Sequence, residues 1–301
     1  MARFLIDFAW KQFFWGLYDK AMNADIFSRA AQVAFYFSFS LFPLLFFLIS
    51  LLGIVLGTTE GLKGELFGYV RQIMPPSAFE LVHKTVEEIV ESSSSGKLTL
   101  GLAITLWSAS AGIDSVRNAL NAVYGLRESR WWWKTKLQSL AITLLLIVLV
   151  AVVLAIVFYG WQLAQAGLAL LGLEVTSPLV LVSIQWIATL LVMLLACEVI
   201  YNWLPNFRRF RWDWITPGSI VAIVLWLLLT RGFRLYLEYF NTYNKTYGSL
   251  GAVIILMLWL YLTAIVVMIG GAINAVIDEI RAEKMANLPE GTDDINADQP
   301  R

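Results

Sequence analysis

The sequence predicts an all-α fold of the polytopic membrane class, a bundle of six transmembrane helices. Composition is the first reason, because 59% of the 301 residues are hydrophobic and only 15% are charged, whereas soluble domains are nearer half apolar and a quarter charged. The second reason is that apolar residues gather into six runs of about 20 residues, the length that a helix needs to cross the hydrocarbon core. The third is the presence of 13 tryptophans, which are enriched at the depth of lipid headgroups.

Residues 1–28 are predicted to form an amphipathic helix that lies in the membrane interface. Aromatic residues such as Phe8 and Trp10 alternate there with charged residues such as Asp7 and Lys11. The segment is too polar to span a bilayer, and its pattern is typical of helices that bury one face among the headgroups.

The membrane domain is predicted over residues 29–281. Its spans are expected at about 30–56, 98–117, 137–159, 178–204, 215–233 and 250–273. The one sizeable extramembrane region, residues 58–97, is expected to be a small helical insert because Pro75-Pro76 separates two helical patterns in it. Residues 282–301 are acidic and contain no aromatic residue, so this tail is predicted to be disordered.

The distribution of Lys and Arg predicts the orientation of the spans. With both termini inside, the segments on the cytoplasmic side hold more than twice as many Lys and Arg residues as those on the other side. Cytoplasmic loops of membrane proteins carry such an excess. Both ends of the chain and the acidic tail are therefore expected in the cytoplasm, and the insert is expected on the extracytoplasmic side.

Polar residues of four helices are expected to meet at one depth, in the cytoplasmic third of the bundle, with Arg29 just before the first span as the contribution of that helix. Asp114 shares a helical face with Arg117 and Asn118, which lie three and four positions later. An ionisable group within the hydrocarbon costs about 2.5–3.5 kcal/mol, so such side chains should face the interior and have partners. The predicted layer consists of Asp114, Arg117, Asn118 and Asn121 from the second span, Glu198 and Asn202 from the fourth, and Asn274 and Asp278 from the sixth.

Three interpretations of this layer are open. It forms a hydrogen-bond network that fixes the helices, it lines a cavity that binds a substrate or an ion, or it performs catalysis. Glu198 is the sharpest case, because residues 190–200 around it are otherwise almost wholly apolar.

A second polar group is expected at the outer interface. Arg231 and Arg234 share a helical face, and arginine binds phosphate through a planar fork, so contact with a lipid headgroup is one interpretation. The alternative is that these side chains only extend to water. The group consists of Arg231, Arg234, Asn241, Tyr243, Asn244 and Lys245.

The sequence argues against an enzyme, a metal site and a nucleic-acid partner. It contains one His and one Cys, so it lacks the usual zinc constellations and the clustered ligands of a metal-dependent nuclease. Lys plus Arg equals Asp plus Glu, 22 each, so no net positive charge attracts nucleic acid. We therefore expect no enzymatic activity, no metal and no cofactor.

Four stretches of the chain form a set whose order and spacing match those of a known family. They are Arg29-Ala30-Ala31 with Ser40-Leu41-Phe42-Pro43, Leu106-Trp107-Ser108 through Asn118-Ala119-Leu120-Asn121, Tyr201-Asn202-Trp203-Leu204-Pro205-Asn206, and Tyr243-Asn244-Lys245 through Gly248-Ser249-Leu250-Gly251-Ala252. The set resembles the YihY/BrkB family and covers roughly residues 29–280. The resemblance implies a multi-pass protein of the bacterial inner membrane with six helices. It also carries links to lipid transport, sodium/proton exchange and serum resistance, and an old ribonuclease label, but it assigns no functional residues.

These observations favour a transporter or flippase of a lipid or other amphiphile that uses the polar layer and has membrane lipids as partners. A sodium/proton antiporter with small ions as ligands is one alternative. A structural or assembly protein that transports nothing is the other.

Overall fold

The computed structural model of the chain describes residues 10–55, 95–170, 177–207, 212–239 and 249–286. Across these ranges it contains seven helices and no strand, so the predicted all-α class is confirmed. The helices are α2 (Trp10–Asn23), α3 (Ile26–Val55), α6 (Ser95–Val123), α7 (Trp132–Leu170), α8 (Pro178–Trp203), α9 (Pro217–Tyr239) and α11 (Ser249–Ala286). Most of the predicted insert, nearly all of the predicted tail, and Asn241, Tyr243, Asn244 and Lys245 lie outside the described residues.

Four of the described helices contain stretches that are long and apolar enough to cross a membrane, so the prediction of an integral membrane protein is supported. These stretches are Trp132–Gln162, Leu179–Trp203, Pro217–Tyr239 and Val253–Lys284. The first two predicted spans coincide with α3 and α6, which are both continuous helices. Large apolar side chains such as Leu179 of α8 and Leu228 of α9 are exposed, as expected for surfaces that face lipid.

Several helices extend beyond the predicted spans. The second span was expected to end near Arg117, whereas α6 continues to Val123. Likewise α7 runs to Leu170 and α11 runs to Ala286. Hydropathy marks only the part of a helix that lies in hydrocarbon, while its backbone hydrogen bonds continue through polar residues into the interface.

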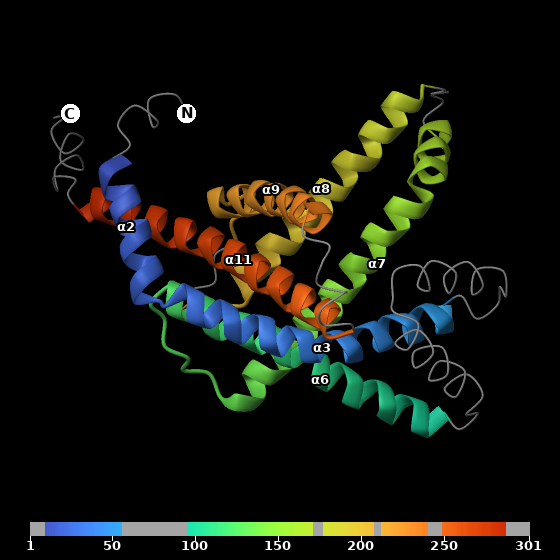
Figure 1. Cartoon of the computed structure of the whole chain (residues 1–301), viewed down its shortest axis with the longest axis horizontal. Coiled ribbons are helices and arrows are strands. Elements are labelled where there is room, and N and C mark those ends of the chain that lie inside the picture. The colour runs from blue at the N-terminus through green and yellow to red at the C-terminus, as the bar shows by residue number, and fades with distance from the viewer. Residues whose placement is uncertain (1–9, 56–94, 171–176, 208–211, 240–248, 287–301) are drawn as a thin grey trace, which may run out of the picture.

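The helix α11 is the centre of the arrangement (Figure 1). It packs against α2, α3, α6 and α9, and its buried residues Met268 and Ala272 contribute to a core that also contains Leu120 of α6. The helices α3 and α6 lie side by side. The α7–α8 pair packs together and extends away from the other helices at one end.

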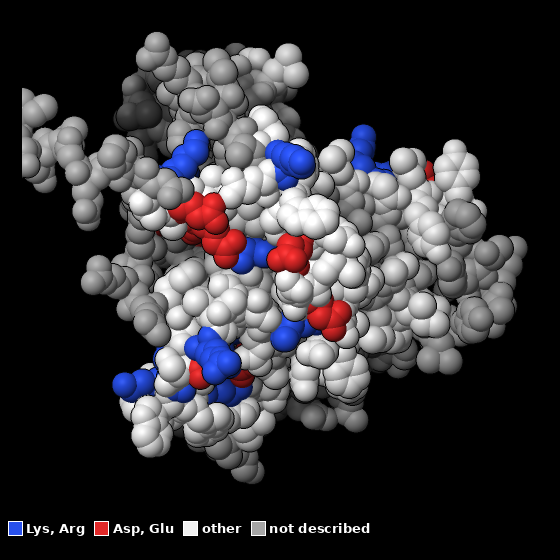
Figure 2. All heavy atoms as spheres, turned by 90° about the vertical axis from the view of Figure 1, so that its left-hand side faces the viewer, with Lys and Arg blue, Asp and Glu red and all other residues white. Residues whose placement is uncertain are grey.

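The amphipathic helix α2 is held against the C-terminal part of α11. Gln12 donates a hydrogen bond to Glu283 at 2.6 Å, and the Lys20 ammonium lies 2.6 Å from a carboxylate oxygen of Glu279. On its other side α2 exposes Phe14 and Trp15, the kind of face that an interfacial helix presents to headgroups. Figure 2 looks onto this end of the molecule and shows side chains of both charge signs gathered there.

Candidate functional site

The candidate site lies at the end of the bundle where α6 and α8 finish and α7 and α9 begin, which we call the polar end. Gly125 stops α6, with φ of +66°, a conformation that favours glycine. Its amide donates to the Ala122 carbonyl, and the Leu126 amide donates to the Asn121 carbonyl at 2.7 Å, the pattern of a Schellman motif. The chain thereby turns back toward α7 and brings Glu128 and Arg130 over the end of α6.

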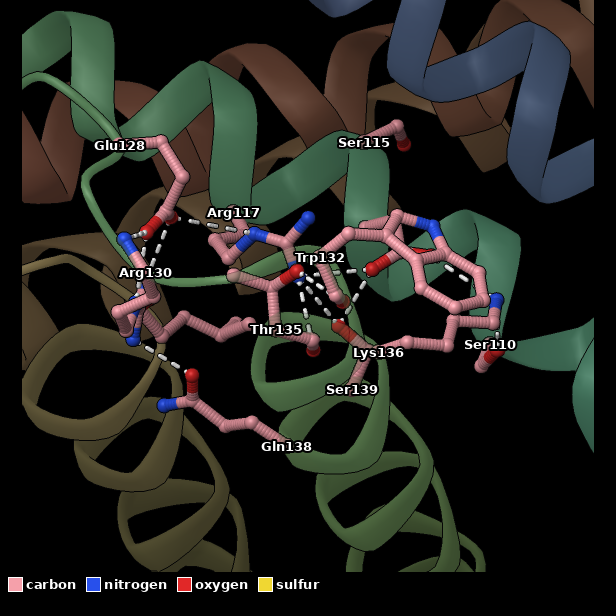
Figure 3. A network of polar contacts seen from close by, with 12 residues as sticks. Ser110, Ser115, Arg117, Glu128, Arg130, Trp132, Thr135, Lys136, Gln138 and Ser139 are labelled. Carbon is pink, nitrogen blue, oxygen red and sulfur yellow. Dashed lines mark hydrogen bonds and ion pairs between the residues drawn. The ribbon is translucent and has the colours of Figure 1, made fainter.

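The first cluster of the polar end is centred on Arg117, whose side chain is only 9% exposed. Its Nη1 atom donates to Asp114 at 2.8 Å, to the hydroxyl of Ser139 at 2.8 Å and to the carbonyl of Thr135 at 3.0 Å. Lys136 donates to the other oxygen of Asp114 at 3.0 Å. Figure 3 shows these side chains converging from α6 and α7, so the cluster joins the two helices.

The loop between α6 and α7 extends the first cluster to α8. Glu128 accepts two bonds of 2.7 Å from Arg130, and it accepts one of 3.1 Å from Asn121. Arg130 also donates to the carbonyl of Leu204, and Gln138 donates to that of Trp203. These are orphan carbonyls at the end of α8, where a cation is favourable because of the helix dipole.

The second cluster is centred on Glu198, which is 1% exposed. One carboxylate oxygen accepts from the amide of Thr216 at 2.7 Å and from the hydroxyl of Ser219 at 2.5 Å. The other accepts from Asn202 at 2.9 Å. Thr216 precedes Pro217, the first residue of α9, so the carboxylate of α8 caps the positive end of α9. In the described chain, all these donors are neutral groups.

The helix α11 joins the second cluster through Asn274. Its side-chain oxygen accepts from the amide of Gly218 at 2.7 Å, and its side-chain nitrogen donates to the hydroxyl of Thr216 at 3.1 Å. Asn121 accepts from the amide of Asn206 at 2.8 Å. The first cluster therefore ties α6 and α7 to the end of α8, and the second ties α8 to α9 and α11, so that α8 is common to both clusters of the layer.

The structure brings most of the predicted layer together. Arg117, Asn121, Glu198, Asn202 and Asn274 are all buried, and Asp114 is partly buried beside Arg117. Two predicted members do not belong to it. Asn118 is exposed because it lies about 100° around α6 from Arg117, and the side chain of Asp278 on α11 is 63% exposed.

Several members of the layer were not predicted as site residues, namely Glu128, Arg130, Thr135, Lys136, Ser139, Thr216 and Ser219. A signal existed for Thr216, because Thr-Pro is a helix-start pattern that places its amide at the end of α9. The sequence also holds a signal for Glu128. Gly125 predicts that α6 ends there and that the chain turns back, which places the residues just after it near the end of α6. Ser139 carried no signal, since a serine in an apolar helix is commonplace.

A cleft of about 560 Å³ lies at the other end of α9, between α9 and α11. It is lined by Thr230, Phe233, Arg234, Leu237, Glu238 and Trp259. The guanidinium of Arg234 is paired with Glu238 at 3.1 Å. Arg231, predicted to act with Arg234, is exposed and is absent from this lining.

Acidification is expected to remove the contribution of Glu128 to stability. Burial raises the pKa of Glu128, but the bonds from Arg130 outweigh it and lower the pKa below the ordinary 4.5. A lowered folded-state pKa means that the carboxylate stabilises the fold above pH 4.5, and that this contribution is lost as the pH falls through the folded-state pKa. The apparent unfolding temperatures of wild type and Glu128→Gln should therefore differ at pH 7, and the difference should shrink as the pH falls below 4.5 and through the folded-state pKa. A difference that is independent of pH would contradict this assignment.

Comparison with known families accounts for the four motif stretches. The family described as virulence factor BrkB matches residues 17–293 of the chain, nearly all of its length. The chain belongs to the BrkB family. The predicted resemblance is thereby confirmed, and the matched range contains the whole polar end and the α9–α11 cleft.

The names of similar proteins also indicate that the chain is a membrane protein. The ribonuclease-like protein YfkH of Bacillus subtilis is 30% identical over 87% of this chain and 92% of its own length. A UPF0761 membrane protein of an Enterobacter species is 30% identical over 75% of this chain and 72% of its own length. A UPF0761 membrane protein of Vibrio vulnificus is 25% identical over 93% of this chain and 88% of its own length. No solved structure matches the chain. Within the described residues, no three His, Cys, Asp or Glu side chains are grouped so as to hold a metal ion.

Proposed function

We propose that this BrkB-family protein is a transporter that moves a lipid or other amphiphile across the bacterial inner membrane. The proposal includes six spans, with α3 and α6 as the first two, and both termini in the cytoplasm, so that the polar end lies on the cytoplasmic side. It includes membrane lipids as partners and no enzymatic step. Support comes from two polar regions at opposite ends of α9, which are separated by about 27 Å along the helix.

The observation that carries the proposal is the composition of the α9–α11 cleft. Its walls combine the apolar side chains Phe233, Leu237 and Trp259 with the ion pair of Arg234 and Glu238. An amphiphile needs both kinds of surface, and this cleft of about 560 Å³ is widely open along the side of the two helices. A small ion would not require apolar walls of this kind.

Replacing Arg234 is expected to slow transport severalfold. In liposomes that contain the purified protein and headgroup-labelled lipid, wild type should move at least one anionic lipid class faster than empty liposomes do. Arg234→Ala should reduce that rate because it removes the fork that binds a phosphate or carboxylate. Arg281→Ala is the matched control, since Arg281 is also an exposed arginine paired with an acidic residue on its own helix. Wild-type liposomes that move no lipid class would refute the proposal.

A sodium/proton exchanger is the second candidate, and the surroundings of Glu198 favour it. A carboxylate that is 1% exposed and held only by neutral groups in the described chain is the kind of group that takes up a proton or a cation during transport. The decisive measurement is a pH- and sodium-dependent flux in wild type and in Glu198→Gln.

A further inference from the structure

The guanidinium of Arg117 uses only one of its edges within the protein. Arginine has five N–H donors, and the three hydrogen bonds that Arg117 gives in the described chain all leave from Nη1. The Nε atom is buried and has no hydrogen-bond partner. The edge formed by Nε and Nη2 therefore makes no hydrogen bond in the described chain, although the side chain is 91% buried.

Glu128 does not satisfy this edge. Its nearer oxygen lies 3.6 Å from Nε, which is an ion-pair distance but longer than a normal hydrogen bond. Both oxygens of Glu128 are already bonded, one to Arg130 and the other to Arg130 and Asn121. Glu128 is therefore oriented by Arg130, and its long ion pair with Nε leaves the Nε–Nη2 edge of Arg117 without a hydrogen bond.

The charge of the surrounding cluster favours an anion at that edge. The ion pairs of the first cluster connect three cationic side chains, Arg117, Arg130 and Lys136, with two anionic ones, Asp114 and Glu128. One positive charge is therefore unbalanced in a partly buried site. Uncompensated charge is unfavourable there, so one bound anion would lower the free energy, whereas a cation would be repelled.

The geometry of the edge selects an oxyanion. Two parallel N–H groups of a guanidinium match two oxygens of a phosphate or carboxylate in a bidentate pair. Phosphate is the anion that a membrane interface supplies, and the exposed rings of Trp131, Trp132 and Trp133 at the start of α7 are typical of headgroup depth. In Figure 3 one nitrogen of the Arg117 guanidinium has no dashed contact and lies apart from the bonded groups. The neighbouring loop residues Arg127 and Ser129 are exposed, so this region is close to water.

We propose that the Nε–Nη2 edge of Arg117 binds the phosphate of a phosphate-bearing anion, either a lipid headgroup or free phosphate. The site deepens the proposed transport function, because it names the chemical group that the polar end recognises, and its role in transport rests on that function. The binding itself does not, since it is measured at equilibrium without any movement of lipid.

The test uses the full chain in nanodiscs of phosphatidylcholine, with radiolabelled inorganic phosphate in equilibrium dialysis. Wild type should bind about one phosphate per chain with a saturable isotherm. Adding phosphatidylglycerol to the nanodiscs separates the two sources. Loss of phosphate binding identifies the headgroup as the natural ligand, and unchanged phosphate binding identifies free phosphate.

Two variants change the site in opposite directions. Arg117→Lys keeps the charge but removes the fork, so phosphate affinity should fall about tenfold or more. Glu128→Gln leaves Arg117 intact and raises the excess charge of the cluster from one to two, so affinity should rise severalfold. Arg281→Lys is the matched control, because it makes the same exchange at an exposed arginine far along α11, and its affinity should equal that of wild type.

The proposal is refuted if wild type binds no phosphate, or if Arg117→Lys and Glu128→Gln bind it as wild type does. If Arg117→Lys does not fold because Asp114 and Ser139 lose their partner, Glu128→Gln decides alone, and an unchanged affinity then refutes the proposal. A chain that binds phosphate but moves no lipid refutes the transport function and leaves this site intact. A chain that moves lipid without binding phosphate refutes the site only.

Discussion

Replacing Gly218 by alanine is expected to destabilise the folded protein by about 3 kcal/mol or more, because its added Cβ atom would make the shortest contact of any glycine in the described helices. A Cβ atom at Gly218 would lie 2.0 Å from the backbone oxygen of Gly270 and 2.6 Å from the side-chain amide of Asn274. Contacts below 3.0 Å force a displacement, and a backbone oxygen cannot rotate away as a side chain can. The start of α9 would have to move away from α11, with the cost of an overpacked core.

That displacement would also disrupt the polar layer. The amide of Gly218 donates to Asn274 at 2.7 Å, and the adjacent Thr216 amide donates to Glu198 at 2.7 Å. Both bonds hold the first turn of α9, so moving this turn weakens two hydrogen bonds of the buried layer. The effect should appear as a lower apparent unfolding temperature of the detergent-solubilised chain and as a lower yield of monodisperse protein.

Gly232→Ala is the matched control, because it makes the same change on the same helix. A Cβ atom at Gly232 would meet nothing within 4 Å, and alanine favours the helix over glycine by up to about 1 kcal/mol. The apparent unfolding temperature of Gly232→Ala should therefore equal or exceed that of wild type. Equal unfolding temperatures for Gly218→Ala and wild type would show that α9 and α11 are farther apart than described.

The helices themselves could be predicted because lipid leaves the backbone few options. Residues within hydrocarbon must satisfy their backbone groups internally, so an apolar run of membrane length is a helix. The positions at which helices end follow different physics. Gly125 ends α6 through its left-handed conformation, a local signal that hydropathy does not register, and α11 continues to Ala286 through polar residues such as Glu279 and Glu283.

The polar layer could be predicted only in part, because depth follows from sequence but pairing does not. Counting residues along the spans placed Arg117, Glu198 and Asn274 at one level. The same count could not predict that Asn118 faces outward, because the rotation of a helix about its axis is set by the helices that pack against it. In the structure α6 directs Arg117 and Asn121 inward and leaves Asn118 exposed. Asn202 is a partner of Glu198 at the helical spacing of four residues, but Thr216 and Ser219 lie 18 and 21 residues later in the chain, and no spacing rule connects them to Glu198.

Glu198→Gln is expected to fold with a modest loss of stability, about 1 kcal/mol, and this makes it a usable test of ion exchange. The glutamine oxygen can still accept from the Thr216 amide and the Ser219 hydroxyl, as Glu198 does at 2.7 Å and 2.5 Å. The glutamine nitrogen then faces the side-chain nitrogen of Asn202, so one buried hydrogen bond is lost. Glu198→Ala should lose about 3 kcal/mol, because it removes every side-chain acceptor between α8 and α9 at this point and leaves a cavity.

The two proposed functions predict different results for Glu198→Gln in liposomes. An amide does not titrate, so a flux that depends on proton or sodium exchange at Glu198 should be abolished. Movement of an amphiphile through the α9–α11 cleft should continue at close to the wild-type rate, since the cleft lies about 27 Å away along α9. Asp278→Asn is the control, because it removes a carboxylate that is 63% exposed and should alter neither flux. A wild-type ion flux that survives in Glu198→Gln would leave the buried carboxylate with a purely structural role as the cap of α9.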